Sequence, residues 1–143
     1  MTLNLIKLCV GPDTLPDLAA WQARRLAQRH HAGEKRELFH ITRNTPRRAK
    51  EMIPGGSLYW VIRGLIVARQ QLIELRRVDK DGVPHCALVL DEELVAVEPR
   101  AHRPFQGWRY LSDQDAPKDM IGSTDNSDLP LELRRELTSL GLI

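Results

Sequence analysis

Two stretches, Ser57–Ile62 and Val83–Leu90, constrain the fold of this chain most strongly. Ser57–Ile62 is so continuously apolar that we expect a strand covered on both faces. Val83–Leu90 is typical of a returning strand, because it follows Asp79-Lys80-Asp81-Gly82, which has the composition of a hairpin turn. The pattern predicts an antiparallel sheet in the middle of the chain.

Leu65–Arg76, between these stretches, fits two structures. The spacing of Leu65, Ala68 and Leu72 is compatible with a helix. The same residues also fit a strand whose apolar alternation is interrupted by polar side chains. We predict a long, bulged strand, because it would pair with Val83–Leu90 across the turn.

The first 42 residues predict a strand, a helix and a second strand. Leu3–Val10 and Glu37–Thr42 have the alternation of strands. Between them, either Asp13 or Thr14 would cap a helix that has Pro16 in its first turn and reaches about His30. Its apolar side is imperfect, because Gln22 intrudes among the residues expected to be buried, which are Leu15, Leu18, Ala19, Ala23 and Leu26.

A second, short helix is predicted to begin with Thr45 as N-cap and Pro46 at its first position. Pro54-Gly55-Gly56 would end it and turn the chain. The backbone N–H groups at such a helix start attract anionic oxygens, and guanidinium groups bind phosphate through two hydrogen bonds. With Arg47 and Arg48 in its first turn, this helix is the predicted phosphate side of a site.

The sequence signals for regular secondary structure are weaker after the predicted hairpin, which ends at Leu90. Leu94–Val97 predicts one more short strand, Glu98–Gln106 is expected to be irregular because of its two prolines, and Gly107–Leu111 returns to regular structure. The acidic segment Ser112–Asp128 is expected to be a loop. Leu129–Leu140 has the single leucine stripe of a last helix.

These elements predict an α+β fold, a mainly antiparallel sheet of five or six strands with helices inserted between the early strands. The 143 residues suffice for one domain, 1–143. No apolar run approaches the ~20 residues of a membrane span, and the first ten residues lack a signal-peptide pattern. Cys9 and Cys86 are too few for a disulfide framework or a zinc site. We therefore expect a cytoplasmic protein without a cofactor or a membrane partner.

Charge is distributed unevenly along the chain. Residues 21–77 contain thirteen Lys or Arg and four Glu, which leaves +9, although the whole chain has a formal net charge of only +2. Such asymmetry favours an anionic partner. The alternative is that these cations form solvated faces of helices.

No catalytic constellation is evident. His85 and Cys86 are neighbours in a predicted strand, so their side chains point to opposite faces and cannot act as a base and a nucleophile. His30 and His31 lack a third ligand at metal spacing. The chain has no HExxH, Walker, GxGxxG or GxSxG motif. We therefore predict no catalytic and no metal-binding residues.

Cations beside aromatic rings favour a binding surface instead. On the Ser57–Ile62 strand, Tyr59 and the following Arg63 would share one face, and Trp60 would anchor the core from the other. The predicted phosphate-binding residues are Arg43, Arg47, Arg48, Arg63 and Arg103, and the predicted stacking or pocket residues are Tyr59, His102, Trp108 and Tyr110. The competing interpretations are core packing for the aromatic residues and structural ion pairs for the arginines.

The segments TRNTPRRAKEM, GGSLYWVIRG, LVLDEELV and RPFQGWRYL with the following DAP resemble a family of alphaproteobacterial proteins defined as a domain of unknown function. This resemblance covers most of the chain and brings no activity. RNTPRRAKEMIPGGSLYWVIRG followed by LIVARQQLIEL is also similar in order to PUA-like domains of the EVE, YTH and ASCH groups. That likeness implies a small, partly open β-barrel that binds RNA or a modified base.

Three functions follow as hypotheses. The first is a PUA-like module that binds RNA, single-stranded DNA or a nucleotide. The second is a small enzyme acting on an anionic metabolite or nucleic-acid derivative, with His40, His85 or His102 as base. The third is a protein–protein adaptor that uses the leucine stripe of Leu133–Leu140.

Overall fold

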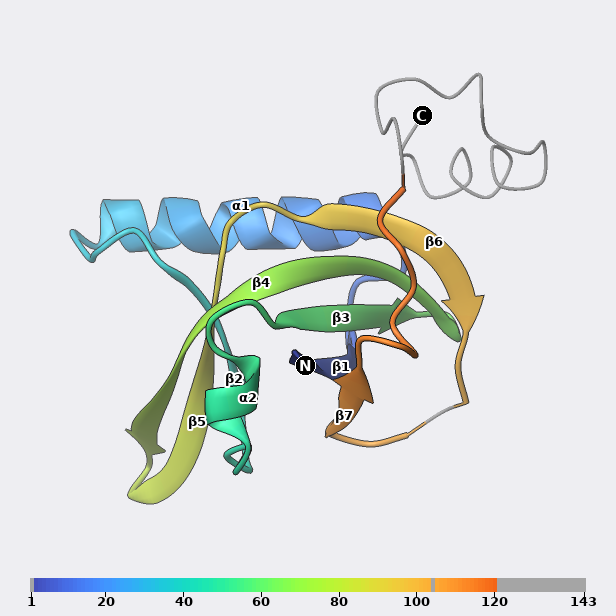
Figure 1. The fold of residues 1–143 in the computed structure, drawn as a ribbon. Coiled ribbons are helices and arrows are strands. Elements are labelled where there is room, and N and C mark those ends of the chain that lie inside the picture. The colour runs from blue at the N-terminus through green and yellow to red at the C-terminus, as the bar shows by residue number, and fades with distance from the viewer. Residues whose placement is uncertain (1, 104, 121–143) are drawn as a thin grey trace.

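The computed structural model describes residues 2–103 and 105–120, in which seven strands form one sheet and two helices flank it (Figure 1). The predicted helix 129–140 lies outside the described residues. The elements in chain order are β1 (Leu3–Leu8), α1 (Leu15–His31), β2 (Leu38–Thr42), α2 (Ala49–Met52), β3 (Ser57–Ile62), β4 (Leu65–Lys80), β5 (Val83–Leu90), β6 (Val95–Ala101) and β7 (Trp108–Ser112).

The long strand β4 connects the two parts of the sheet. Its first half pairs with β3 and β6, and its second half pairs with β5. The strand order is β2-β5-β4-β3-β1-β7, with β6 attached to β4. Every pairing is antiparallel except that of β1 with β3. The bulged strand predicted for Leu65–Arg76 is confirmed, and the alternative helix is not formed. Register shifts interrupt both the β4–β5 and the β4–β6 ladders.

The predicted α+β class is confirmed, but the prediction of five or six strands needs correction. The sheet has seven strands and is mixed, and within the described residues no ladder closes it into a barrel. The segment expected to be irregular from Glu98 belongs in part to β6, which runs through Pro99 to Ala101. Pro99 is tolerated there because it lies where the β4–β6 register shifts and no ladder hydrogen bond requires its N–H.

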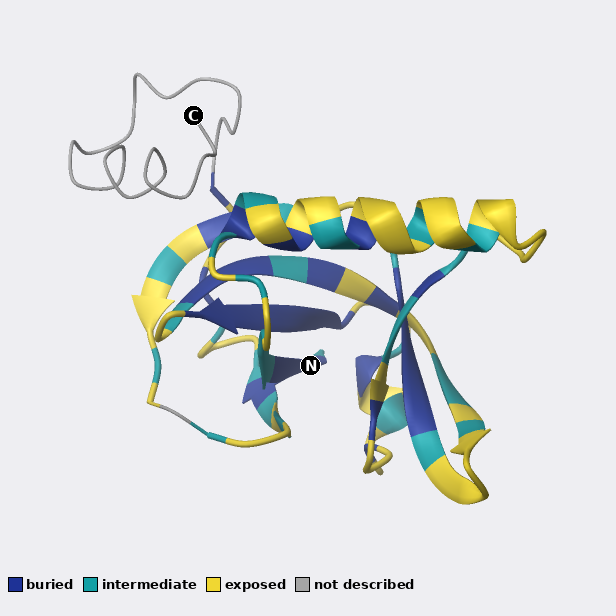
Figure 2. Cartoon of the chain, turned by 180° about the vertical axis from the view of Figure 1, so that it is seen from behind, coloured by how far each residue is buried: buried dark blue, intermediate teal, exposed yellow. Residues whose placement is uncertain are grey.

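Helix α1 begins as predicted, with Thr14 Oγ1 accepting a hydrogen bond from the Asp17 N–H at 3.2 Å. Its buried side comprises Leu15, Leu18 and Gln22, whereas the helix's other side faces solvent (Figure 2). Ala19 and Ala23, expected on the buried side, are exposed. No described helix has the length and apolar character needed to cross a membrane.

The predicted helix start at Thr45 and Pro46 is wrong. Helix α2 begins only at Ala49, and Arg48 is its N-cap. The backbone N–H groups of Arg47 and Arg48, which would have faced a Thr45 cap or an anion, donate instead to the hydroxyl oxygen of Tyr110, at 3.0 and 3.2 Å. A tertiary contact has therefore replaced the local capping signal.

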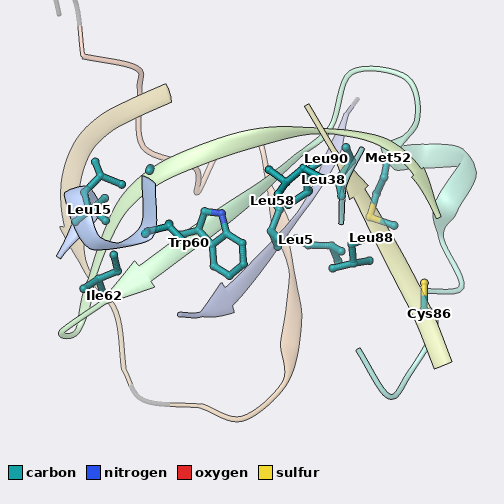
Figure 3. Packing of buried hydrophobic residues seen from close by; sticks show 14 of the residues in the cluster. Leu5, Leu15, Leu38, Met52, Leu58, Trp60, Ile62, Cys86, Leu88 and Leu90 are labelled. Atoms are coloured by element: carbon teal, nitrogen blue, oxygen red, sulfur yellow. The ribbon is translucent and has the colours of Figure 1, made fainter. Parts of the chain in front are cut away.

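Strand β3 is buried along its whole length, as predicted. Leu58, Trp60 and Ile62 pack into the larger core cluster with α1 and β5, and Trp60 is only 2% exposed (Figure 3). Tyr59 and Val61 pack into a second cluster on the opposite face, with β6 and β7. Trp60 is thus confirmed as a core residue.

Gln22 and Gln70 form a buried amide pair between α1 and β4. Each Nε2 donates to the other's Oε1, at 2.8 and 2.9 Å, and Gln70 is completely buried. Gln70 Oε1 also accepts from Trp60 Nε1 at 2.8 Å, and Gln70 Nε2 also donates to the Asp91 carbonyl at 3.1 Å. The glutamine that interrupts the apolar stripe of α1 is therefore the helix's polar attachment to the sheet.

Candidate functional site

The segment Arg43–Arg48, after β2, is attached to β7 by side chains rather than by a ladder. Trp108 Nε1 donates to the Asn44 carbonyl at 3.0 Å, and the Tyr110 hydroxyl accepts the two N–H groups described above. The Trp108 and Tyr110 rings meet edge to face, 5.0 Å apart. We call this junction between β2, residues 43–48 and β7 the seam.

A hollow of about 500 Å³ lies at the seam, and we call it the seam cleft. Its size is within the range of small-molecule sites. It combines three cationic residues with two aromatic ones and contains no carboxylate. Its lining residues are Lys7, Ile41, Thr42, Arg43, Asn44, Gln106, Gly107, Trp108, Arg109 and Tyr110.

Lys7 comes to the cleft from β1, between two tryptophan-bearing strands. Its partner in β3 is Trp60 and its partner in β7 is Trp108, so the lysine lies on the same sheet face as both rings. Burial lowers the pKa of Lys7 from its usual value, and Cys9 opposes this effect. Among the described residues, no carboxylate forms an ion pair with its ammonium group.

Two ionisable groups near Lys7, His40 and Cys9, are held in their neutral forms. Burial, together with the positive charges of Lys7 and Arg25, lowers the pKa of His40 to about 4. Its ring meets that of Trp60 edge to face, 5.4 Å away. Burial raises the pKa of the Cys9 thiol to about 11 despite the nearby Lys7. Neither group is suited to nucleophilic or general-base chemistry at neutral pH in this state.

The neutral His40 gives a testable dependence of stability on pH. In the unfolded chain His40 takes up a proton near pH 6.5, whereas in the folded chain it does so only near pH 4. Its contribution is therefore fully present above pH 6.5 and is lost as the pH falls toward 4. We expect the free energy of unfolding to fall by about 2 kcal/mol from this group between pH 7.5 and pH 5.

Urea denaturation at both pH values checks this expectation. In His40→Phe the pH-dependent loss should shrink by that amount. An unchanged loss in His40→Phe would contradict the expectation.

The other two histidines considered as bases lie elsewhere. His85 Nδ1 is 2.9 Å from the Val83 carbonyl oxygen, and His102 Nδ1 is 2.8 Å from the Arg103 carbonyl oxygen. Each ring therefore has a backbone partner close in sequence. Neither is among the residues that line the seam cleft.

The structure brings some of the predicted site residues together at the seam. Arg43, Trp108 and Tyr110 line the cleft, and the Arg48 guanidinium lies 5.4 Å from the Tyr110 ring centroid. Arg43 uses one N–H to reach the Pro84 carbonyl, at 2.9 Å. The Arg47 backbone is also held at the seam through Tyr110. In the described structure Arg48 forms an ion pair with Glu51.

The remaining predicted residues do not converge on this cleft. Tyr59 is 7% exposed and lines a different hollow, beside Arg69. Arg63 lies in the turn between β3 and β4 with a φ of +52°, so the strand alternation that would align it with Tyr59 has already ended. His102 packs edge to face on Phe105, and Arg103 is exposed beside it.

Much of the positive charge of residues 21–77 is neutralised locally. Six of the thirteen cations form ion pairs with carboxylates, with N–O distances from 2.5 to 3.7 Å. Arg36 pairs with Glu92 and Arg69 with Asp119, so acids from the later part of the chain return to the basic segment. The six arginines are Arg29, Arg36, Arg48, Arg69, Arg76 and Arg77.

Lys7, Asn44, Gln106 and Arg109 line the cleft but were not among the predicted site residues. For Lys7 the sequence contains a signal. It continues the face of Leu3 and Leu5 in the first strand, and a lysine on an apolar strand face calls for an explanation. The other three become neighbours only through the seam.

Residues 5–143 match the model of the family described as "Protein of unknown function (DUF1489)", and the chain belongs to that family. The likeness to a domain of unknown function is thereby confirmed, while the match provides no link to PUA-like domains. No curated protein and no solved structure matches the chain.

Proposed function

We propose that this chain is a binding module for nucleotides or single-stranded nucleic acid and that the seam cleft holds the ligand. One observation carries the proposal. The cleft gathers Lys7, Arg43 and Arg109 with Trp108 and Tyr110, and no carboxylate lines it. Cations with aromatic rings and without acids suit a ligand that is both anionic and planar.

The chemistry of the lining supports this choice. Trp108 is half-buried and contributes a ring on which a base would stack, worth roughly 1–3 kcal/mol. Arg43 is exposed and has N–H donors beyond the one that reaches Pro84, so its guanidinium would bind a phosphate. A PUA-like relationship belongs to the same proposal, because RNTPRRAKEMIPGGSLYWVIRG followed by LIVARQQLIEL is similar to such domains in the order of its elements.

The other two hypotheses receive less support. A general base would require a histidine beside a carboxylate in a pocket, and His40 has cations as its charged neighbours instead. The adaptor hypothesis depends on Leu133–Leu140, which lies outside the described residues.

The proposal predicts that Arg43→Gln weakens binding of fluorescent single-stranded oligonucleotides about tenfold at moderate salt, because one charge-assisted phosphate contact is lost. The slope of log affinity against log salt should become shallower by about 1. Fluorescence anisotropy measures both quantities.

Arg24→Gln is the matched control, since Arg24 is an exposed arginine of α1 that does not line the cleft. It should bind like the wild type. The proposal fails if the wild type binds neither mixed oligonucleotides nor nucleotides, or if Arg24→Gln and Arg43→Gln have equal effects. Circular dichroism verifies that both variants are folded.

A further inference from the structure

We infer that the Lys7 ammonium binds a terminal phosphate, so that the seam cleft takes a phosphomonoester attached to a planar ring. The ligand would be a free nucleotide or the phosphorylated end of a strand, not the interior of a strand. This inference rests on the proposed function and goes beyond it by naming the chemical group that is recognised.

The position of Lys7 is the first argument. Its side chain belongs to the sheet face that carries Trp60 and Trp108, one on each neighbouring strand. It is half-buried there and lines the cleft. Within residues 2–103 and 105–120 no carboxylate pairs with it. A half-buried cation without a counter-ion is costly, and a bound anion would offset that cost.

The surroundings of Lys7 are the second argument. His40, on which the charge of Lys7 acts, is neutral at pH 7, and the other charge that acts on His40 is the positive Arg25. Cys9 remains a thiol at neutral pH. No carboxylate is among the described residues that line the cleft. A phosphomonoester carries about −1.5 to −2 charges near pH 7, whereas an internal phosphodiester carries only one. The terminal group therefore compensates this local positive charge more completely.

The arrangement of cations is the third argument. A protein that binds the interior of a strand needs a positively charged groove along which successive phosphates lie. Here, six of the thirteen cations of residues 21–77 form ion pairs with carboxylates. Lys7, Arg43 and Arg109 instead surround a single hollow from β1, the seam segment and β7. That geometry matches one phosphate next to one ring.

The test compares ligands that differ only in their phosphate. Each ribonucleoside 5′-monophosphate and its nucleoside is titrated into wild type, Lys7→Met and Lys7→Arg, with calorimetry as the measurement. In parallel, short single-stranded oligonucleotides with a 5′-phosphate, a 5′-hydroxyl or a circular backbone are titrated by anisotropy. Lys50→Met, which removes an exposed lysine of α2, is the matched control.

We expect at least one monophosphate to bind roughly 10- to 100-fold more tightly than its nucleoside, and Lys7→Met to abolish that preference. Lys7→Arg should retain part of it, and Lys50→Met should retain all of it. Lys7→Met is expected to fold, because methionine has a similar shape and removes a desolvated charge. A urea midpoint no lower than that of the wild type would confirm this.

The oligonucleotides distinguish the two sources of the phosphate. A preference for the 5′-phosphorylated strand shows recognition of a strand end, and a preference limited to mononucleotides shows a free nucleotide. If circular, hydroxyl-ended and phosphorylated strands bind equally and Lys7→Met changes nothing, this inference fails while the proposed function stands. If no nucleotide or strand binds the wild type, both fail.

Discussion

Replacing Gln70 by leucine is expected to lower the free energy of unfolding by about 3–5 kcal/mol. The substitution keeps the size of the side chain but removes the oxygen that accepts from both Gln22 Nε2 and Trp60 Nε1. It also removes the donor to the Asp91 carbonyl. Gln22 and Trp60 are buried, and a buried group that loses its partner costs about 1–3 kcal/mol. The Asp91 carbonyl is half-buried. Urea denaturation followed by circular dichroism measures the change.

Two further variants test whether the network causes the loss. Gln22→Leu should cost less than Gln70→Leu, because Gln70 would still bond to Trp60 and to Asp91. The double variant should lose less free energy of unfolding than the two single variants together. In each single variant one amide remains without its partner amide, whereas in the double variant both amides are removed. Gln71→Leu, the exposed neighbour in β4, should change stability by less than about 0.5 kcal/mol. Equal losses for Gln70→Leu and Gln71→Leu would contradict the argument.

The strands could largely be predicted from the sequence because their signals are local. Apolar continuity located β3, and Asp81-Gly82 located the β4–β5 turn, where both residues have positive φ. The sequence also shows that Gln22 interrupts the apolar side of α1. It does not show that Gln22 bonds to Gln70, because the two residues are 48 positions apart. The start of α2 was misplaced for the same reason, since Tyr110 takes the N–H groups that a local cap would have used.

The candidate site was predicted only in part. Arg43 and Trp108 were identified from composition, because cations beside rings form a local pattern. Lys7 was missed, because its setting depends on the register that aligns it with Trp60 and Trp108. The net charge of residues 21–77 overstates the positive charge that a ligand would meet, because ion pairs such as Arg36–Glu92 join residues that lie far apart in the sequence.

The second large effect is expected at Gly56, where alanine should lower the free energy of unfolding by more than about 3 kcal/mol or prevent folding. The reason is space rather than φ. A Cβ at this position would lie 2.5 Å from the Met52 carbonyl oxygen and still closer to that of Leu3. Both obstacles are backbone atoms, so no side-chain rotation can relieve them.

Gly56 is also hydrogen-bonded on both sides, which prevents it from moving away. Its N–H donates to the Met52 carbonyl at 2.6 Å, and its carbonyl accepts from the Leu72 N–H at 2.9 Å. A shift that made room for a methyl group would therefore separate the end of α2 from β4. Gly64→Ala is the comparison, because Gly64 has a φ of +77° and no atom near its added Cβ. Alanine there should cost only about 1–2 kcal/mol of backbone strain. Urea midpoints for the two variants rank the effects, and a Gly56→Ala protein as stable as Gly64→Ala would refute the steric argument.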